Sequence, residues 1–261
     1  MRFLEFIKFN NIFKNFLIFI PLLVAGKQIT LSNLSIFCEA FIIFFFLTTC
    51  CYIVNNFTDR KIDKKNILKK NKYYPDDKEV SLFLLGFFLL FIISVFYFKR
   101  QSDFLIYLYI ANFILYNFFL KQKFIFDILL LSNFYLIRLF YGIEIFELSF
   151  SSGFFLFFVT LFLSLSFGKR IIQINVNNLL STNLIIPYSK KYLPLLKVSF
   201  ICFLSANYII FLFFFLQNLF FFSSEINFFL NIKEYNYLQI ISIAILYSLL
   251  ISRLSFFVLK D

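Results

Sequence analysis

Long apolar runs dominate the chain and constrain its fold more than any other feature. A helix that crosses a lipid bilayer needs about 20 mostly apolar residues. The apolar stretch 218–230 is short and contains Glu225, so we expect it to lie at the membrane interface; the alternative is that it forms one further span, a ninth beside the eight given below. The runs do not alternate apolar with polar residues, as strands of a membrane barrel do. About eight helical spans are expected, over residues 12–26, 34–57, 80–98, 103–120, 124–145, 151–167, 193–217 and 236–258.

Composition agrees with an all-α, polytopic membrane protein. Hydrophobic residues make up 61% and charged residues 15% of the 261 positions, and the mean hydropathy is +0.86. An ordinary soluble domain is about 45–50% apolar and about 25% charged, so a soluble domain or a disordered chain is excluded. The chain has no histidine, which rules out His-based catalysis and His metal sites. We expect one transmembrane domain over residues 1–261.

The positions of Lys and Arg predict the orientation in the lipid bilayer. Most of the 25 basic residues fall in the N-terminus, 58–79, 121–123, 168–197 and the C-terminus, and cytoplasmic segments are the ones enriched in such residues. Both termini are therefore expected in the cytoplasm. The net charge of +11 is explained by this topology, and since no aromatic-basic recognition module is visible we expect no nucleic-acid partner. The few basic residues of the opposite loops are Lys27, Lys99, Arg100 and Lys233.

The polar residues that close the second expected span form the most informative motif. Asn55, Asp59 and Asp63 recur every four residues, and a helix that continues past the span places them on one face, about 6 Å apart. Two carboxylates and an amide oxygen suit Mg²⁺, which often shares its ligands with substrate phosphates. The alternative is a solvated helix end, and spacing alone does not decide between the two. The following lysines either steer a polyphosphate to this face or anchor the chain on anionic lipid: Lys64, Lys65, Lys69, Lys70 and Lys72.

Ionisable residues inside the fifth span mark either function or a buried ion pair, because charge at membrane depth costs at least about 2.5–3.5 kcal/mol. Asp127 is expected near the cytoplasmic end, where it can line a polar cavity. Arg138 is expected deep in the span and needs a partner, for which Glu39 or Glu144 is available. Other polar or cationic helix ends converge on the same side and, with the acidic face, predict a site for a Mg²⁺-bound diphosphate: Lys14, Asn15, Tyr116, Lys121, Lys169 and Arg170.

The ordered set of motifs resembles the UbiA-type membrane prenyltransferase superfamily, and most of all its decaprenyl-phosphate phosphoribosyltransferase-like enzymes. The second-span motif is similar to the family's NDxxDxxxD pattern, although Asn56 replaces its first Asp. Gln173 stands where a Glu usually follows the Gly-Lys-Arg segment, and no clear second Asp-rich motif is present. The other matching pieces are Lys14-Asn15 with Pro21, Tyr116 to Lys121, Asp127 with Arg138 and Gly142, and Gly168-Lys169-Arg170.

The resemblance implies Mg²⁺-dependent transfer of a 5-phosphoribosyl group from phosphoribosyl diphosphate to a polyprenyl phosphate, with release of diphosphate, in cell-envelope synthesis at a bacterial plasma membrane. Two alternatives are prenyl transfer from a prenyl diphosphate to an aromatic acceptor, and a non-catalytic relative that binds lipid or a partner. Homo-oligomerisation and prenyl length are left open. In the first reading Asn55, Asp59 and Asp63 hold Mg²⁺ and diphosphate.

The remaining roles are implied by the same resemblance. Asp59, Asp63, Tyr116 and Lys121 form the expected catalytic set. Tyr116 and Asn15 orient the sugar, Asp127 is a weaker candidate for the ribose hydroxyls, and Arg138 is expected to be structural. The side chains expected to bind the donor or acceptor phosphates are Lys14, Lys121, Lys169 and Arg170.

Overall fold

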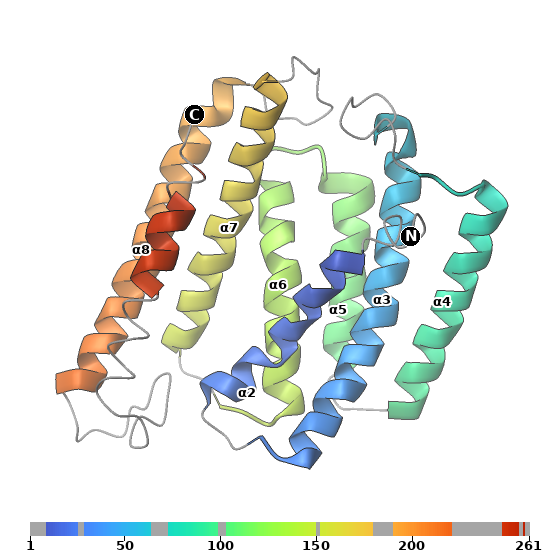
Figure 1. Cartoon of the computed structure of the whole chain (residues 1–261), viewed down its shortest axis with the longest axis horizontal. Coiled ribbons are helices and arrows are strands. Elements are labelled where there is room, and N and C mark those ends of the chain that lie inside the picture. Colours follow the sequence, from blue (N-terminus) through green and yellow to red (C-terminus); the bar gives the residue numbers. More distant parts are fainter. Residues whose placement is uncertain are drawn as a thin grey trace.

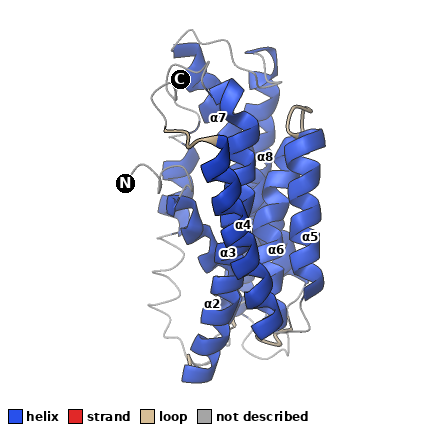
Figure 2. Cartoon of the chain, turned by 90° about the vertical axis from the view of Figure 1, so that its right-hand side faces the viewer, coloured by secondary structure: helices blue, strands red, loops and turns tan. Residues whose placement is uncertain are grey.

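The protein folds as a bundle of helices, and the described part of the chain contains no strand (Figure 2). The computed structural model describes residues 9–25, 29–63, 73–98, 103–149, 152–179, 190–220, 247–255 and 258. The elements are η1 (Phe9–Ile18), α2 (Ile20–Val24), α3 (Leu31–Asp63), α4 (Asp77–Phe98), α5 (Asp103–Ile114), η3 (Leu115–Leu120), α6 (Phe126–Ile145), α7 (Ser152–Leu179), η4 (Lys190–Tyr192) and α8 (Leu193–Phe220). Residues 247–255 add a further helical segment.

Among the described residues, five helices are long and apolar enough to cross a bilayer, which confirms the predicted polytopic all-α class. The fourth expected span is a shorter apolar helix, Phe104–Leu120, and the first is η1 followed by α2. The predicted interfacial stretch 218–230 lies largely outside the described residues, as do the first part of the span expected at 236–258 and the lysine-rich segment 64–72. The five candidate spans are Leu31–Arg60, Asp77–Phe98, Phe126–Ile145, Ser152–Val176 and Leu193–Phe213.

The helices stand side by side, with α4 at one edge and α8 at the other (Figure 1). The α4 helix packs against α3, and α8 packs against α7. Between these pairs, η1 crosses the bundle and contacts both α3 and α6. The C-terminal ends of α3 and α7 and the turn between η3 and α6 lie at the same end of the molecule, as the predicted topology requires (Figure 1).

The segment η1 is a 3-10 helix of 10 residues, which is unusually long for this conformation. Its geometry explains its burial pattern, because side chains three positions apart eclipse one another in a 3-10 helix. Ile12, Asn15 and Ile18 are accordingly buried on one face, while Phe13 and Phe16 are exposed on another. The inward face carries a polar side chain, Asn15, into the centre of the bundle.

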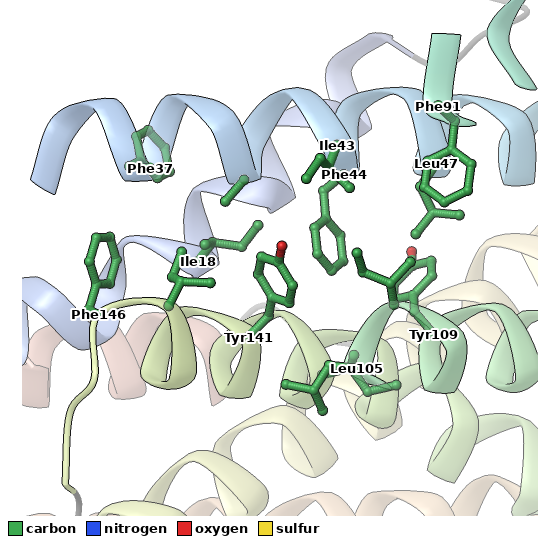
Figure 3. Packing of buried hydrophobic residues seen from close by; sticks show 14 of the residues in the cluster. Ile18, Phe37, Ile43, Phe44, Leu47, Phe91, Leu105, Tyr109, Tyr141 and Phe146 are labelled. Carbon is green, nitrogen blue, oxygen red and sulfur yellow. The ribbon is translucent and has the colours of Figure 1, made fainter. Parts of the chain in front are cut away.

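A close approach between η1 and α6 requires glycine at position 142. A Cβ atom built on Gly142 would lie 2.1 Å from the carbonyl oxygen of Ile18, far inside van der Waals contact. Beside this contact, α3, α5 and α6 pack through aromatic rings (Figure 3). The Phe44 ring lies 4.9 Å from that of Tyr141 and 5.5 Å from that of Tyr109, both edge to face, which is a favourable aromatic arrangement.

Acidic residues lie at the start of α4. The helix begins at Asp77, and Asp77 and Glu79 lie in its first turn, where acidic groups favour the helix dipole. The Glu79 carboxylate accepts a hydrogen bond from the backbone N–H of Asp76 at 3.3 Å, as in a capping box. Arg60 of α3 forms an ion pair with Asp77 at 2.6 Å. This exposed end of α4 is therefore tied to the acidic end of α3.

Candidate active site

A cavity of about 710 Å³ opens between η1, α3, α5, η3, α6 and α7, a size typical of small-ligand sites. It brings together eight of the ten predicted catalytic and binding residues, from four separate segments of the chain. The eight are Lys14, Asn55, Asp59, Asp63, Tyr116, Lys121, Lys169 and Arg170. Two other predicted residues, Asn15 and Asp127, do not line it.

The acidic face of α3 is formed as its spacing predicted. Asn55, Asp59 and Asp63 all line the cavity, and the Asn55 side-chain N–H donates to Asp59 at 3.2 Å. The Tyr74 hydroxyl donates to Asp63 at 3.0 Å from the loop before α4. Burial, together with this bond to a carboxylate, raises the pKa of Tyr74, so its hydroxyl remains a donor at physiological pH. Asn56, by contrast, is fully buried and does not line the cavity.

Lys121 joins η3 to the acidic face. Its ammonium group donates to the side-chain oxygen of Asn55 at 2.8 Å and forms an ion pair with Asp59. The turn that carries Lys121 into α6 ends at Ile125, whose φ of 69° lies in the left-handed region. A branched residue adopts this conformation at a cost of about 1–3 kcal/mol, and such strain is concentrated at functional sites.

The donor set on α3 fits Mg²⁺ that is held jointly with a substrate. The described residues contain no group of three or more His, Cys, Asp or Glu side chains able to hold a metal by themselves. Mg²⁺, however, is usually bound through one or two carboxylates together with substrate phosphates. Asp59 and Asp63 supply two carboxylates and Asn55 a neutral oxygen. The Lys121 ammonium now bonds to the same oxygens, so a metal ion would have to displace it from Asp59.

The opposite wall of the cavity comes from α7 and is anchored by a buried ion pair. Arg170 pairs with Asp127, the first-turn acid of α6, which is fully buried. Arg170 also donates to Gln173 and lies 3.5 Å from the Tyr116 hydroxyl. Asp127 was expected to line the cavity and to contact ribose. The structure instead places it behind the wall, where its charge balances and orients the Arg170 guanidinium.

The π-helical segment η3 contributes cavity residues that the sequence analysis missed. These are Asn117, Phe118 and Phe119, which line the cavity beside the predicted Tyr116. Asn117 accepts a hydrogen bond from Thr58 of α3 at 3.2 Å. A π-helix turns successive side chains away from the usual register and is frequent at functional sites. An apolar run of the kind found at 103–120 gives no sign of this irregularity.

Arg138 lies at the inner part of the cavity, and its partners differ from those expected. Its guanidinium donates to the Asn15 side-chain oxygen at 2.9 Å, to the Phe134 carbonyl at 2.8 Å and to the Tyr109 hydroxyl at 2.8 Å. The expected ion pair with Glu39 or Glu144 does not form. Asn15 also donates to Thr48 at 3.3 Å. Asn15 was expected to orient a sugar, but it is fully buried and holds Arg138 in place.

The cavity wall also includes polar aromatic residues from within the spans that the sequence analysis did not single out. Tyr52, Tyr109 and Tyr135 all line it. Tyrosine combines an apolar ring with a polar hydroxyl, and this polar group in the middle of a span was the available signal. The chain has 15 Tyr residues, however, so residue type alone could not separate these three from the others.

The fold and the cavity define a multi-pass membrane protein whose helical bundle contains a polar, highly charged site. The model of the UbiA prenyltransferase family matches residues 16–172, and the chain therefore belongs to this family. The matched range includes the acidic face, Lys121 and Arg170. The predicted superfamily is thereby confirmed, and the chain is, at the level of the family, a membrane prenyltransferase. Members of this family generally use Mg²⁺ bound with diphosphate substrates.

A solved structure agrees with the fold. It is reported for digeranylgeranylglyceryl phosphate synthase in membranes, and it aligns with a TM-score of 0.58 over 98% of this chain and 95% of the other. Sequence identity is 15%, so the likeness concerns the fold alone. No curated protein matches the chain.

Proposed function

We propose that the protein transfers a 5-phosphoribosyl group from phosphoribosyl diphosphate to a polyprenyl phosphate, in the presence of Mg²⁺. The observation that carries this proposal is the charge of the cavity wall. Asp59 and Asp63 are its two carboxylates, and both lie on α3. Five cationic side chains surround the same space: Lys14, Lys121, Arg138, Lys169 and Arg170.

The cations of the wall outnumber the acids even when Asp127, which pairs with Arg170 behind the wall, is counted with Asp59 and Asp63. This excess fits two phosphorylated substrates better than one. Phosphoribosyl diphosphate carries a diphosphate and a separate 5-phosphate, and the lipid acceptor carries a phosphate of its own. A prenyl diphosphate with an aromatic acceptor would bring a single polyanion to the same wall. Buried charges are stable only when they are compensated, so the number of cations is an indication of the number of anionic groups bound.

The chemistry requires few protein groups. An oxygen of the acceptor phosphate forms a bond to the anomeric carbon of the ribose, and the bond from that carbon to the diphosphate oxygen breaks, with the electron pair leaving on diphosphate. The acceptor is already ionised at neutral pH, so no general base is needed, in agreement with a chain that lacks histidine. Cationic side chains that contact the leaving group stabilise the negative charge that develops on it.

The proposed roles follow the contacts in the cavity. Asp59, Asp63 and Asn55 hold the diphosphate through Mg²⁺, which when bound supplies positive charge to the leaving group. Lys121, which pairs with Asp59 in this structure, would contact the diphosphate if Mg²⁺ took its place beside that carboxylate. Lys169 and Arg170 bind phosphate from the α7 side, and Tyr116 orients the sugar between these walls. Asp127 and Asn15 act as positioning residues, for Arg170 and Arg138 respectively.

We also propose a setting for the reaction, on the basis of the charge pattern of the sequence and of the resemblance. We place the chain as a single domain, residues 1–261, in a bacterial plasma membrane with both termini and the cavity mouth on the cytoplasmic side. Phosphoribosyl diphosphate is a soluble metabolite and would enter from that side. The polyprenyl chain would remain in the lipid, and the product would serve cell-envelope synthesis.

The proposal is tested with purified protein in detergent, labelled phosphoribosyl diphosphate, a polyprenyl phosphate and Mg²⁺. The expected result is label in the lipid phase, lost on addition of EDTA and in Asp59→Asn. Exposed Arg253 lies outside the cavity lining, so Arg253→Gln is the matched control and should retain transfer. Label that stays in the aqueous phase in every condition would contradict the proposal.

Prenyl transfer is the second candidate, because it is the activity for which the family is named. It is distinguished in the same preparation by supplying labelled prenyl diphosphate with an aromatic acid. Prenylated product in that arm, without phosphoribosyl transfer, would assign the second activity. No product in either arm would identify a non-catalytic relative that binds lipid or a partner.

A further inference from the structure

Arg138 is a buried cation held in a fixed orientation at the cavity wall. Its side chain is 2% exposed, yet it lines the cavity. Its hydrogen bonds to Asn15, Phe134 and Tyr109 all go to neutral oxygens. A guanidinium group has five N–H donors in a rigid plane, so these three bonds fix its direction and leave further donor capacity.

No carboxylate compensates this charge within the described part of the chain. Arg138 forms no ion pair there, whereas Arg60 pairs with Asp77, Lys121 with Asp59 and Arg170 with Asp127. Asparagine, tyrosine and a backbone carbonyl can orient a guanidinium, but they carry no negative charge. A buried charge without a counter-charge is strongly unfavourable, so the native state benefits from any anion that reaches it.

A second cation lies beside the first. The Lys14 ammonium lies over the Tyr135 ring, 5.8 Å from its centroid, and the next residue of η1, Asn15, bonds to Arg138. Lys14 makes no ion pair or hydrogen bond among the described residues, and it lines the cavity. Two cations that line the same cavity, one of them held by three hydrogen bonds, form a site that an anion between them would stabilise.

This pair is separated from the acidic face by aromatic side chains. The Phe134 ring lies 5.0 Å from that of Tyr109, which bonds to Arg138, and 5.8 Å from that of Tyr116, which lies beside Arg170. Asp59 and Asp63 bond instead to Lys121 and to Tyr74. The cavity thus has an outer end, where Asp59 and Asp63 already have bonding partners, and an inner end, where Lys14 and Arg138 lie without a carboxylate.

We propose that Lys14 and Arg138 form a binding site for a phosphate monoester, distinct from the outer end that takes the metal-bound diphosphate. The guanidinium plane presents N–H groups in the geometry that suits phosphate oxygens, and the ammonium adds a flexible point charge. The bound phosphate is either that of the lipid acceptor or the 5-phosphate of the donor. Only the naming of these two molecules rests on the proposed function.

Equilibrium binding to the full-length protein in detergent, without Mg²⁺, tests the site. The probes are radiolabelled farnesyl phosphate, ribose 5-phosphate and farnesol. We expect Arg138→Gln and Lys14→Gln each to weaken the binding of one of the two phosphates at least about tenfold. Farnesol binding should not change. Exposed Arg253 does not line the cavity, and its control variant Arg253→Gln should stay within about twofold of the parent protein.

The pattern of losses identifies the source of the phosphate. Weaker binding of farnesyl phosphate assigns the inner end to the lipid acceptor, and weaker binding of ribose 5-phosphate assigns it to the donor. Because Arg138 is hydrogen-bonded within the bundle, its variant is checked by thermal unfolding and gel filtration. Lys14 has no hydrogen-bonded partner among the described residues to lose, so Lys14→Gln gives a decisive result even if the arginine variant does not fold.

Three results would overturn the proposal. The first is that neither phosphate binds to the parent protein, and the second is that Lys14→Gln binds both probes as the parent does. The third is competition by benzoate at concentrations where inorganic phosphate does not compete, which would identify a carboxylate site. None of these measurements requires turnover. If the variants lose phosphate binding and the parent protein transfers no phosphoribosyl group, the proposed site stands and only the proposed activity fails.

Discussion

The outer and inner ends of the cavity differ in how their charges are compensated. At the outer end, Asp59 pairs with Lys121 and Asp63 accepts a bond from Tyr74. At the inner end, Arg138 bonds only to neutral oxygens among its described contacts, and Lys14 lies next to it. Ligand binding at the outer end must therefore exchange existing partners, whereas binding at the inner end supplies a counter-charge that the protein lacks. The difference assigns metal-dependent binding to one end and metal-independent binding to the other.

The largest effect is expected at the outer end, in Asp59→Asn. This change removes the carboxylate that bonds to Lys121 and that we expect to contact Mg²⁺, so transfer should fall by about 100-fold or more. Phosphate binding at the inner end should persist, because no contact there is altered. Steady-state transfer is measured on the same preparation as the binding of whichever probe, farnesyl phosphate or ribose 5-phosphate, the inner end is found to bind. If both were lost in a folded protein, the two ends would not be independent.

Gly142→Ala should disturb the inner end through the backbone. The new Cβ would collide with the Ile18 carbonyl and push η1, which carries Lys14 and Asn15, away from α6. Overpacking of this kind costs about 1–3 kcal/mol. Gly86→Ala is a matched control, because nothing lies within 4 Å of the added atom. Thermal unfolding in detergent should show a lower midpoint for the first variant only; equal midpoints would argue against the close packing of η1 and α6.

Asp127→Asn tests whether a buried acid positions a cation of the wall. Removing one partner of a buried pair costs about 3–5 kcal/mol, so the variant should unfold at a lower temperature. A positioning role predicts, in addition, a KM for phosphoribosyl diphosphate about tenfold higher with a smaller change in kcat. Asp127→Glu should restore part of the loss. Reduced stability with an unchanged KM would make the pair purely structural.

The smallest effect is expected for Tyr74→Phe, which removes one hydrogen bond to Asp63 and should cost about 0.5–1.5 kcal/mol. The pKa of Tyr74 is raised on folding, so its stabilising contribution is complete below its ordinary pKa of about 10 and is lost as the pH rises above that value. Parent and variant should therefore converge in stability under alkaline conditions. A constant difference up to high pH would show that the bond does not govern this titration.

Regular periodicity explains which parts of the site could be predicted from the sequence. Asn55, Asp59 and Asp63 share a face because α3 remains a regular helix through Asp63, so counting residues was sufficient. The all-α membrane fold followed similarly from the apolar runs. Lys121 and Arg170 could be placed near that face because the topology brings their helix ends to one side of the bundle.

Irregular backbone and buried polar contacts could not be predicted in the same way. The 3-10 geometry of η1 turns Asn15 inward to Arg138, and the π-helical η3 turns Asn117 toward Thr58. Both depend on tertiary packing rather than on local pattern. Asp127 was placed at the correct end of its span, but the sequence could not show that Arg170 covers it.

The most direct test of the account is an experimental structure of the protein with phosphoribosyl diphosphate, Mn²⁺ in place of Mg²⁺ and a non-reactive lipid phosphonate. The account predicts an anomalous Mn²⁺ signal beside Asp59 and Asp63, Lys121 displaced onto the diphosphate, and a second phosphorus-containing group between Lys14 and Arg138. Metal bound elsewhere, or a single anion spanning both ends of the cavity, would contradict it.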